Sequence, residues 1–151
     1  AISKTGMSTV CTRSDDGSHV YVDGFKVAAR PGLHPPRTGC GDKWLSRGLH
    51  SVLVTMFENG GGAYQRLTYK GPDTGGKEVL MPSAGFEGDC EAPVPKCDCG
   101  AGWCANFYYN PVGLKQVRDF PDFKRLVPQA AKTLLTIGYH NDGQIARMLG
   151  K

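Results

Sequence analysis

The sequence of 151 residues lacks the features that define several broad classes of protein. It has no apolar run near the roughly 18 to 20 residues that cross a bilayer, so no membrane span is predicted. It has no Asn-x-Ser/Thr sequon, so N-glycosylation is not expected. Its 18 lysines and arginines are scattered along the chain. Without a basic run, the net charge of +4 does not predict nucleic-acid binding.

Signatures of catalysis are missing as well. There is no Gly-x-Ser-x-Gly motif, and the glycine-rich NGGGAY lacks the Lys-Ser/Thr of a phosphate-binding loop. Glu58 and Asp23 are carboxylates, but nothing around them marks an acid and nucleophile pair of a glycosidase. His50 is expected to pack in a core rather than bind a metal, and the other histidines are isolated. We therefore expect that the protein is not an enzyme.

The six cysteines are concentrated, with four of them between residues 90 and 104. An even number in such a cluster is typical of a disulfide framework in an oxidising compartment, which predicts an extracellular or cell-surface protein. The alternative is a zinc site at CDCGAGWC, although its spacing is unusual and no histidine is near. The sequence does not decide the pairing. The cysteines expected in disulfides are Cys11, Cys40, Cys90, Cys97, Cys99 and Cys104.

The chain divides by composition into three parts. Its 21 glycines and 10 prolines favour a turn-rich, mainly β architecture. Residues 1–90 are predicted to form short strands between glycine-rich turns, residues 91–104 a Cys/Pro/Gly-rich linker, and residues 105–151 a more aromatic segment with a strand near residues 134–139. Because the chain opens on Ala1 rather than Met and shows no signal peptide, we expect a processed chain or an excised fragment.

Three stretches within residues 1–90 carry specific expectations. HVYVD alternates apolar and polar residues and predicts a strand. LHSVLVTMFE is apolar on both faces, which favours a central strand covered on both sides, and YQRLTYKG is expected to return beside it as a hairpin. The Pro/Gly-rich residues 31–42 are expected to form a loop.

Much of this part resembles the PA14 family, the β-sandwich module named after the anthrax toxin protective antigen. The matching features are Gly6, then SDDGSHVYVDG (Ser14–Gly24), then GLHSVLVTMFENGGGAYQRLTYKGPD (Gly48–Asp73). The resemblance implies an all-β fold, a PA14-like antiparallel β-sandwich stabilised by disulfides. The family usually has aromatic residues before SDDGS. Here GMSTVC stands in that place, and a disulfide at Cys11 is expected to replace their packing.

The C-terminal part of this chain resembles the N-terminal segment of the PA14 family. The resemblance lies in GWCANFYYN (Gly102–Asn110), FPDFKRL (Phe120–Leu126) and TIGYHNDG (Thr136–Gly143). Three explanations stay open: a window across two tandem modules, a circular permutation, or a subunit whose C-terminal part completes the sandwich of the next one and so builds a filament. The aromatic residues of the first stretch are interpreted as core or interface: Trp103, Phe107, Tyr108 and Tyr109.

Asp15 and Asp16 are the functional candidates. In yeast adhesins similar to this family, an adjacent Asp pair and a later Asn hold Ca²⁺, and the ion binds sugar hydroxyls. The resemblance implies the same role for Asp15, Asp16 and Asn59, provided that both loops lie at one end of the sandwich. The alternative is that SDDGS forms a hairpin turn and nothing more, because Asp and Gly favour turns.

Two functions are therefore expected from different classes. The first is an extracellular module for carbohydrate binding or adhesion that depends on calcium and has glycans as partners. The second is a structural subunit of an extracellular filament or matrix, assembled head to tail through self-association or tandem modules.

Overall fold

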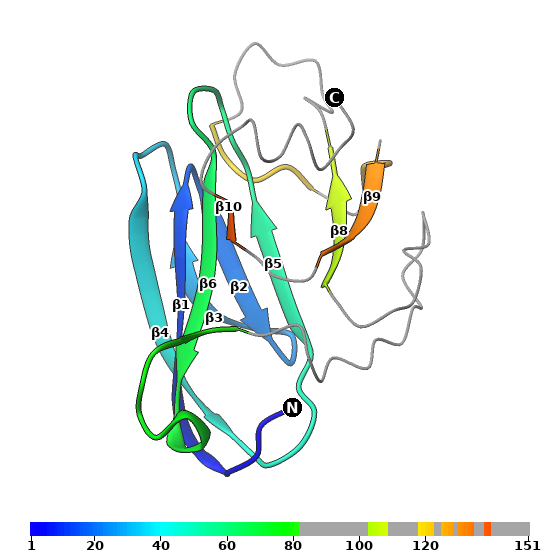
Figure 1. Cartoon of the computed structure of the whole chain (residues 1–151). Coiled ribbons are helices and arrows are strands. Elements are labelled where there is room, and N and C mark those ends of the chain that lie inside the picture. The colour runs from blue at the N-terminus through cyan, green and yellow to red at the C-terminus, as the bar shows by residue number, and fades with distance from the viewer. Residues whose placement is uncertain (82–102, 109–117, 123–124, 129, 135–137, 140–151) are drawn as a thin grey trace.

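The computed structural model describes residues 1–81, 103–108, 118–122, 125–128, 130–134 and 138–139. Its strands form two antiparallel sheets that pack face to face, together with a separate two-stranded ribbon (Figure 1). The all-β architecture predicted from composition is confirmed. Within the described residues, no helix has the length and apolar character that a membrane crossing needs.

The first sheet has the strand order β10-β6-β1-β4, with β7 also paired to β6. Its strands are β1 (Gly6–Asp15), β4 (Arg37–Leu45), β6 (Tyr64–Lys70), β7 (Val79–Leu80) and β10 (Gly138–Tyr139). The second sheet has the order β3-β2-β5. Its strands are β3 (Phe25–Arg30), β2 (Ser18–Val22) and β5 (Val52–Met56). The ribbon pairs β8 (Trp103–Phe107) with β9 (Ala130–Leu134), and a short 3-10 helix, η1 (Pro72–Thr74), follows β6.

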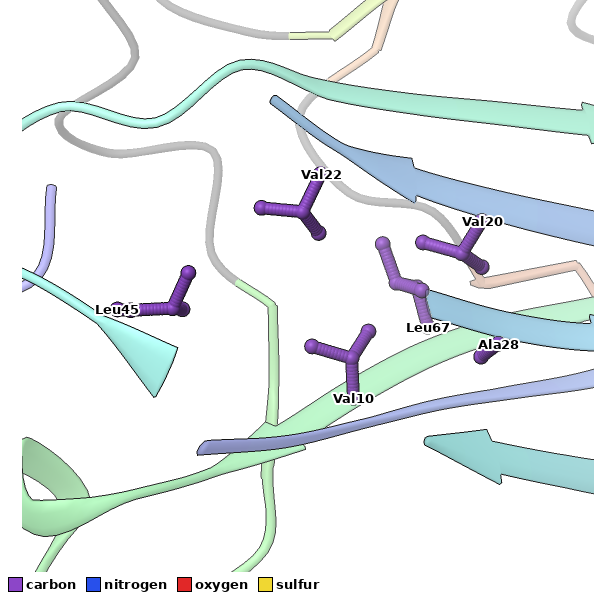
Figure 2. Close-up of a cluster of buried hydrophobic side chains, with 6 residues drawn as sticks. All are labelled: Val10, Val20, Val22, Ala28, Leu45 and Leu67. Carbon is purple, nitrogen blue, oxygen red and sulfur yellow. The ribbon is translucent and has the colours of Figure 1, made fainter. Parts of the chain in front are cut away.

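The two sheets enclose a small apolar core (Figure 2). It forms because side chains alternate along each strand, so that every second residue of β1, β2 and β6 points between the sheets. Burying one such aliphatic side chain stabilises the fold by about 1.5 to 3 kcal/mol. The buried residues of this cluster are Val10, Val20, Val22, Ala28, Leu45 and Leu67.

Glycines in β4 let the two sheets approach closely along one side. Gly39 and Gly41 share a face of the strand, and a Cβ on either would overlap a backbone carbonyl oxygen of β3, that of Ala29 or of Val27. The prediction of a loop over residues 31–42 was therefore wrong from Arg37 onward. Glycine is unfavourable in a strand by propensity, but here it is the residue that the close packing requires.

The connections between strands differ from those expected. SDDGS joins β1 to β2, which belong to different sheets, so it is a crossover between layers and not a hairpin turn. The segment after β5 likewise leads to β6 in the other sheet, which overturns the predicted hairpin. β5 is an edge strand, and Leu53 on its outer face is 59% exposed, so the prediction of a central strand was also wrong.

A disulfide joins Cys11 and Cys40 at directly opposed positions of β1 and β4. Cys11 lies on the face of β1 opposite to Val10, so the bridge is on the outer side of the sheet. The expected disulfide at Cys11 is thereby confirmed. Cys90, Cys97 and Cys99 lie outside the described residues, and only the backbone of Cys104, within β8, is described.

Parts of the C-terminal segment contact the sandwich. Gly138 and Tyr139 of β10 pair with β6. The ring of Phe120 stacks on His19 of β2 with 3.9 Å between the ring centroids and meets Phe57 edge to face at 5.0 Å. The predicted boundary between the linker and the C-terminal part, at residues 104 and 105, falls within β8. Tyr108 is half-buried, and the side chains of the other three aromatic candidates are not described.

Candidate functional site: a three-loop acidic cluster

Three loops meet at the side chain of Asp16, which is 6% exposed. Its Oδ1 atom accepts the backbone N–H of His34 at 2.9 Å, from the loop between β3 and β4. Its Oδ2 atom accepts the backbone N–H of Asn59 at 3.0 Å, from the loop between β5 and β6. A buried carboxylate is stable when such hydrogen bonds replace its hydration. Asp16 thus joins the SDDGS crossover to both other loops.

The loop between β5 and β6 is positioned by the packing of the SDDGS crossover against Phe57. The backbone N–H of Phe57 donates to the carbonyl oxygen of Gly17 at 3.0 Å. A Cβ on Gly17 would overlap the ring of Phe57, whose exposure is only 6%. The glycine of SDDGS is therefore needed for close approach, and this approach fixes the start of the loop that follows β5.

Three carboxylates gather where these loops meet. Asp15, Asp16 and Glu58 each offer one oxygen, and the three oxygens lie within 4.8 Å of one another. The peptide bond between the two aspartates is cis. Clustered carboxylates repel each other, and a shared cation relieves that repulsion. The cluster could hold a metal ion, and its oxygen-only donor set suits a hard cation better than zinc.

Asn59 adds a second observation at the same place. Its carboxamide oxygen, Oδ1, is buried and has no hydrogen-bond partner among the described residues, although its backbone N–H is bound to Asp16. A buried polar atom without a partner is costly, and a cation or its bound water is a partner that would remove the cost. The residues present therefore fit an oxygen-coordinated ion.

A network of buried hydroxyl groups lies beside the cluster, between the sheets. Ser18 Oγ is 2.7 Å from Thr12 Oγ1 and 2.7 Å from Ser14 Oγ, and Gln65 Nε2 donates to Thr12 Oγ1 at 3.0 Å. All four side chains are at most 3% exposed. The interior is therefore apolar around Val10 and polar toward Asp15, and the hydrogen bonds hold the ends of β1 and β2 in one arrangement.

A pair of titratable side chains, His50 and Asp23, lies at the opposite end of β2 from this cluster. His50 Nδ1 lies 2.7 Å from Asp23 Oδ2, and His50 Nε2 lies 2.9 Å from the carbonyl oxygen of Ser46. Burial acts to lower the pKa of His50, but the hydrogen bonds to Ser46 and Asp23 and the charge of Asp23 outweigh it and raise that pKa. His50 is thus an ion-paired histidine rather than a core one. Asp23 is engaged with it and not with Glu58.

The structure brings together Asp15, Asp16 and Asn59, the residues singled out in the sequence. It adds Glu58, which sequence reasoning did not assign to this group. The signal that could have identified Glu58 is its position directly before Asn59, at the start of the loop that follows β5. Comparisons of the chain with protein-family models, with curated proteins and with solved structures each find no match.

Proposed function

We propose that this chain is an extracellular PA14-like module that binds carbohydrate through a calcium ion held by Asp15, Asp16, Glu58 and Asn59. The observation that carries the proposal is the convergence of three carboxylates at the junction of three loops. Beside them is Asn59, whose backbone N–H bonds to Asp16 and whose amide oxygen is buried and unpartnered among the described residues. The Cys11–Cys40 disulfide supports the extracellular assignment, because disulfides persist in oxidising compartments.

Calcium is favoured over other metals by the chemistry of the donors. It takes six to eight oxygen ligands at about 2.3 to 2.6 Å, so ligand oxygens around one ion lie up to about 5 Å apart. The spacing of at most 4.8 Å among the three carboxylate oxygens matches this range. When bound, calcium supplies further coordination positions that sugar hydroxyls can occupy. The role proposed is binding without catalysis, since the protein groups of the cluster serve as ligands.

The experiment is a thermal melt with and without calcium. At a calcium concentration about 100 times the Kd, mass action stabilises the folded state by about 2.7 kcal/mol, which raises the Tm by several degrees. Asp16→Asn is expected to abolish that gain. Asp42→Asn is the matched control, because Asp42 is exposed on β4 and bonded to Thr9. Equal melting curves in calcium and in chelator would contradict the proposal.

Head-to-tail assembly is a second candidate, supported by the contacts of the C-terminal segment. β10 adds to the edge of β6 through two residues, and Phe120 stacks on His19. Residues 82–102 separate these elements from the main sandwich in sequence, and a chain of that length reaches about 70 Å when extended. The same contacts can therefore form within one chain or between consecutive copies, and the second arrangement propagates into a filament.

Light scattering and electron microscopy of the purified chain test assembly directly. The assembly function predicts polymers under native conditions, and truncation after residue 81 is expected to give units that no longer polymerise. A stable monomer at high concentration would contradict assembly. This result would leave the calcium proposal intact.

A further inference from the structure

Two arginines lie directly opposite each other on the outer face of the first sheet. Arg13 of β1 and Arg66 of β6 are register partners, and both are exposed. Like charges at opposed positions of an antiparallel pair destabilise a sheet. In the described part of the chain neither arginine forms an ion pair with a carboxylate. The pair is therefore a local concentration of positive charge that an external anion would neutralise.

This arginine pair is next to the acidic cluster. Asp15 and Tyr64 are the register partners two positions further along the same face of the same two strands. The guanidinium of Arg13 lies over the ring of Tyr64, 5.5 Å from its centroid. Residues two apart on a strand face are separated by about 7 Å, roughly the size of one sugar ring. The cluster, an aromatic ring and the two arginines thus follow one another along a single surface.

We infer that the carbohydrate bound at this site is acidic, with a carboxylate or sulfate group that pairs with Arg13 and Arg66 while hydroxyl groups reach the calcium ion. The inference rests on the proposed function, because the cation is what makes the carboxylate cluster compatible with an anionic ligand. Arginine suits this role, since its planar guanidinium binds carboxylates and sulfates with two parallel hydrogen bonds. The ring of Tyr64 holds the guanidinium of Arg13 through a cation–π contact, on the same face of the sheet as Asp15.

The test measures the affinity of the chain for three polysaccharides in calcium and in chelator. A galactomannan is neutral, unsulfated chondroitin carries carboxylates only, and chondroitin sulfate carries both anionic groups. One charge-assisted hydrogen bond is worth about 1.5 kcal/mol or more, so each arginine is expected to contribute about tenfold in affinity. An acidic polymer should therefore bind about a hundredfold more tightly than the neutral one in calcium. The affinity for unsulfated chondroitin tells whether a carboxylate without a sulfate is sufficient for the preference.

Two double variants separate a specific site from general attraction of a basic protein for a polyanion. Arg13→Gln with Arg66→Gln is expected to remove the preference for acidic polymers while retaining the calcium-dependent rise in Tm, which also shows that the variant is folded. Lys70→Gln with Lys77→Gln removes the same charge. Lys70 is exposed on the same face of β6, four residues beyond Arg66, and Lys77 is an exposed residue beyond η1. This control is expected to keep the preference.

The possible negative results distinguish a failure of this inference from a failure of the proposed function. Calcium-dependent binding with equal affinity for neutral and acidic polymers overturns the inference and leaves the proposed function standing. An equal loss in both double variants overturns it too, since the effect would then be one of net charge. If none of the three polymers binds in calcium, the proposed function fails and the inference falls with it.

Discussion

The backbone N–H of Asn59 donates a hydrogen bond to Oδ2 of Asp16 at 3.0 Å, although 43 positions separate the two residues in the chain. The other oxygen of the same carboxylate accepts the N–H of His34. The side chain of Asp16 therefore hydrogen-bonds to two loops besides its own and holds the three together at one end of the sandwich. Metal binding at this place is expected to depend on Asp16 twice, through its charge and through the positions of the loops.

Asp16→Asn is expected to destabilise the fold even in chelator. An amide keeps one acceptor oxygen and replaces the other by an NH₂ group, so one of the two backbone donors loses its acceptor. The cost of a buried unpaired donor is about 1 to 3 kcal/mol. Urea unfolding at fixed pH measures it. Asp42→Asn is expected to change the free energy of unfolding by less than about 0.5 kcal/mol, as is usual for surface sites. An equal, small effect in both variants would show that Asp16 does not organise the loops.

Glu58→Gln should separate charge from structure at the cluster. Glu58 Oε1 accepts the N–H of Gly60, and glutamine retains that acceptor. Removing one of three clustered negative charges relieves repulsion, so the Tm in chelator is expected to stay equal or to rise. Calcium affinity should fall about ten- to hundredfold, because it depends on the number of charged ligands. Calorimetric titration measures this change. An unchanged calcium affinity would remove Glu58 from the proposed ligand set.

Local features of the fold were readable from the sequence, whereas the pairing of strands was not. Alternation identified the strand in HVYVD, and YQRLTYKG is β6, because side-chain period depends only on neighbouring residues. Whether SDDGS closes a hairpin or crosses between sheets depends on where β2 finds its partner. β2 pairs with β3, which follows it directly, and with β5, whose paired residues lie 30 to 38 positions later. A turn motif contains no information about such a distant pairing.

The candidate site could likewise be predicted only in part from the sequence. Asp15, Asp16 and Asn59 were identified by residue type and by resemblance, and the structure places their loops together. Glu58 was missed because its membership depends on the direction in which the loop after β5 leaves the strand. That direction is set by the contact of Phe57 with Gly17. Tertiary contacts of this kind leave no periodic pattern in the sequence.

Gly39→Ala and Gly41→Ala are expected to destabilise the protein strongly. The added methyl group would overlap a carbonyl oxygen of β3, which is backbone and has little freedom to move. Overpacking of this kind costs about 1 to 3 kcal/mol per site. Gly62→Ala is the control, because no atom lies within 4 Å of its Cβ position. Denaturant midpoints of the three variants test the idea. A tolerated Gly41→Ala would contradict the close approach of β4 to β3.

Replacing both Cys11 and Cys40 by alanine removes a cross-link between residues 29 positions apart. The chain-entropy argument gives a loss of about 3 to 4 kcal/mol for a loop of this length, because the unfolded chain gains freedom. Unfolding in urea with and without a reductant measures the loss. Without reductant, the double variant should unfold at a lower midpoint than the wild type, and this comparison isolates the Cys11–Cys40 bridge. A midpoint that does not change on reduction would show that this bridge adds little to stability.

The ion pair of His50 and Asp23 predicts a dependence of stability on pH. Burial acts to raise the pKa of Asp23, but the hydrogen bonds from His50 and Ser51 and the charge of His50 outweigh it and lower that pKa. Because the pKa of His50 is raised, its contribution is full below the ordinary value of 6.5 and is lost as pH rises through the higher folded value. The contribution of Asp23 is full above its ordinary value of 3.8 and is lost as pH falls through the lowered value.

The pair should therefore be strongest between about pH 4 and 6.5, and His50→Gln should lower the free energy of unfolding there by about 0.5 to 1 kcal/mol, as expected for a partly exposed pair. The difference from wild type is expected to shrink as pH rises through the folded pKa of His50. NMR titration supplies an internal comparison, because burial and Lys26 lower the pKa of His19 despite Asp119. His50 should titrate above 6.5 and His19 below it. The reverse order would show that Asp23 does not hold the protonated form of His50.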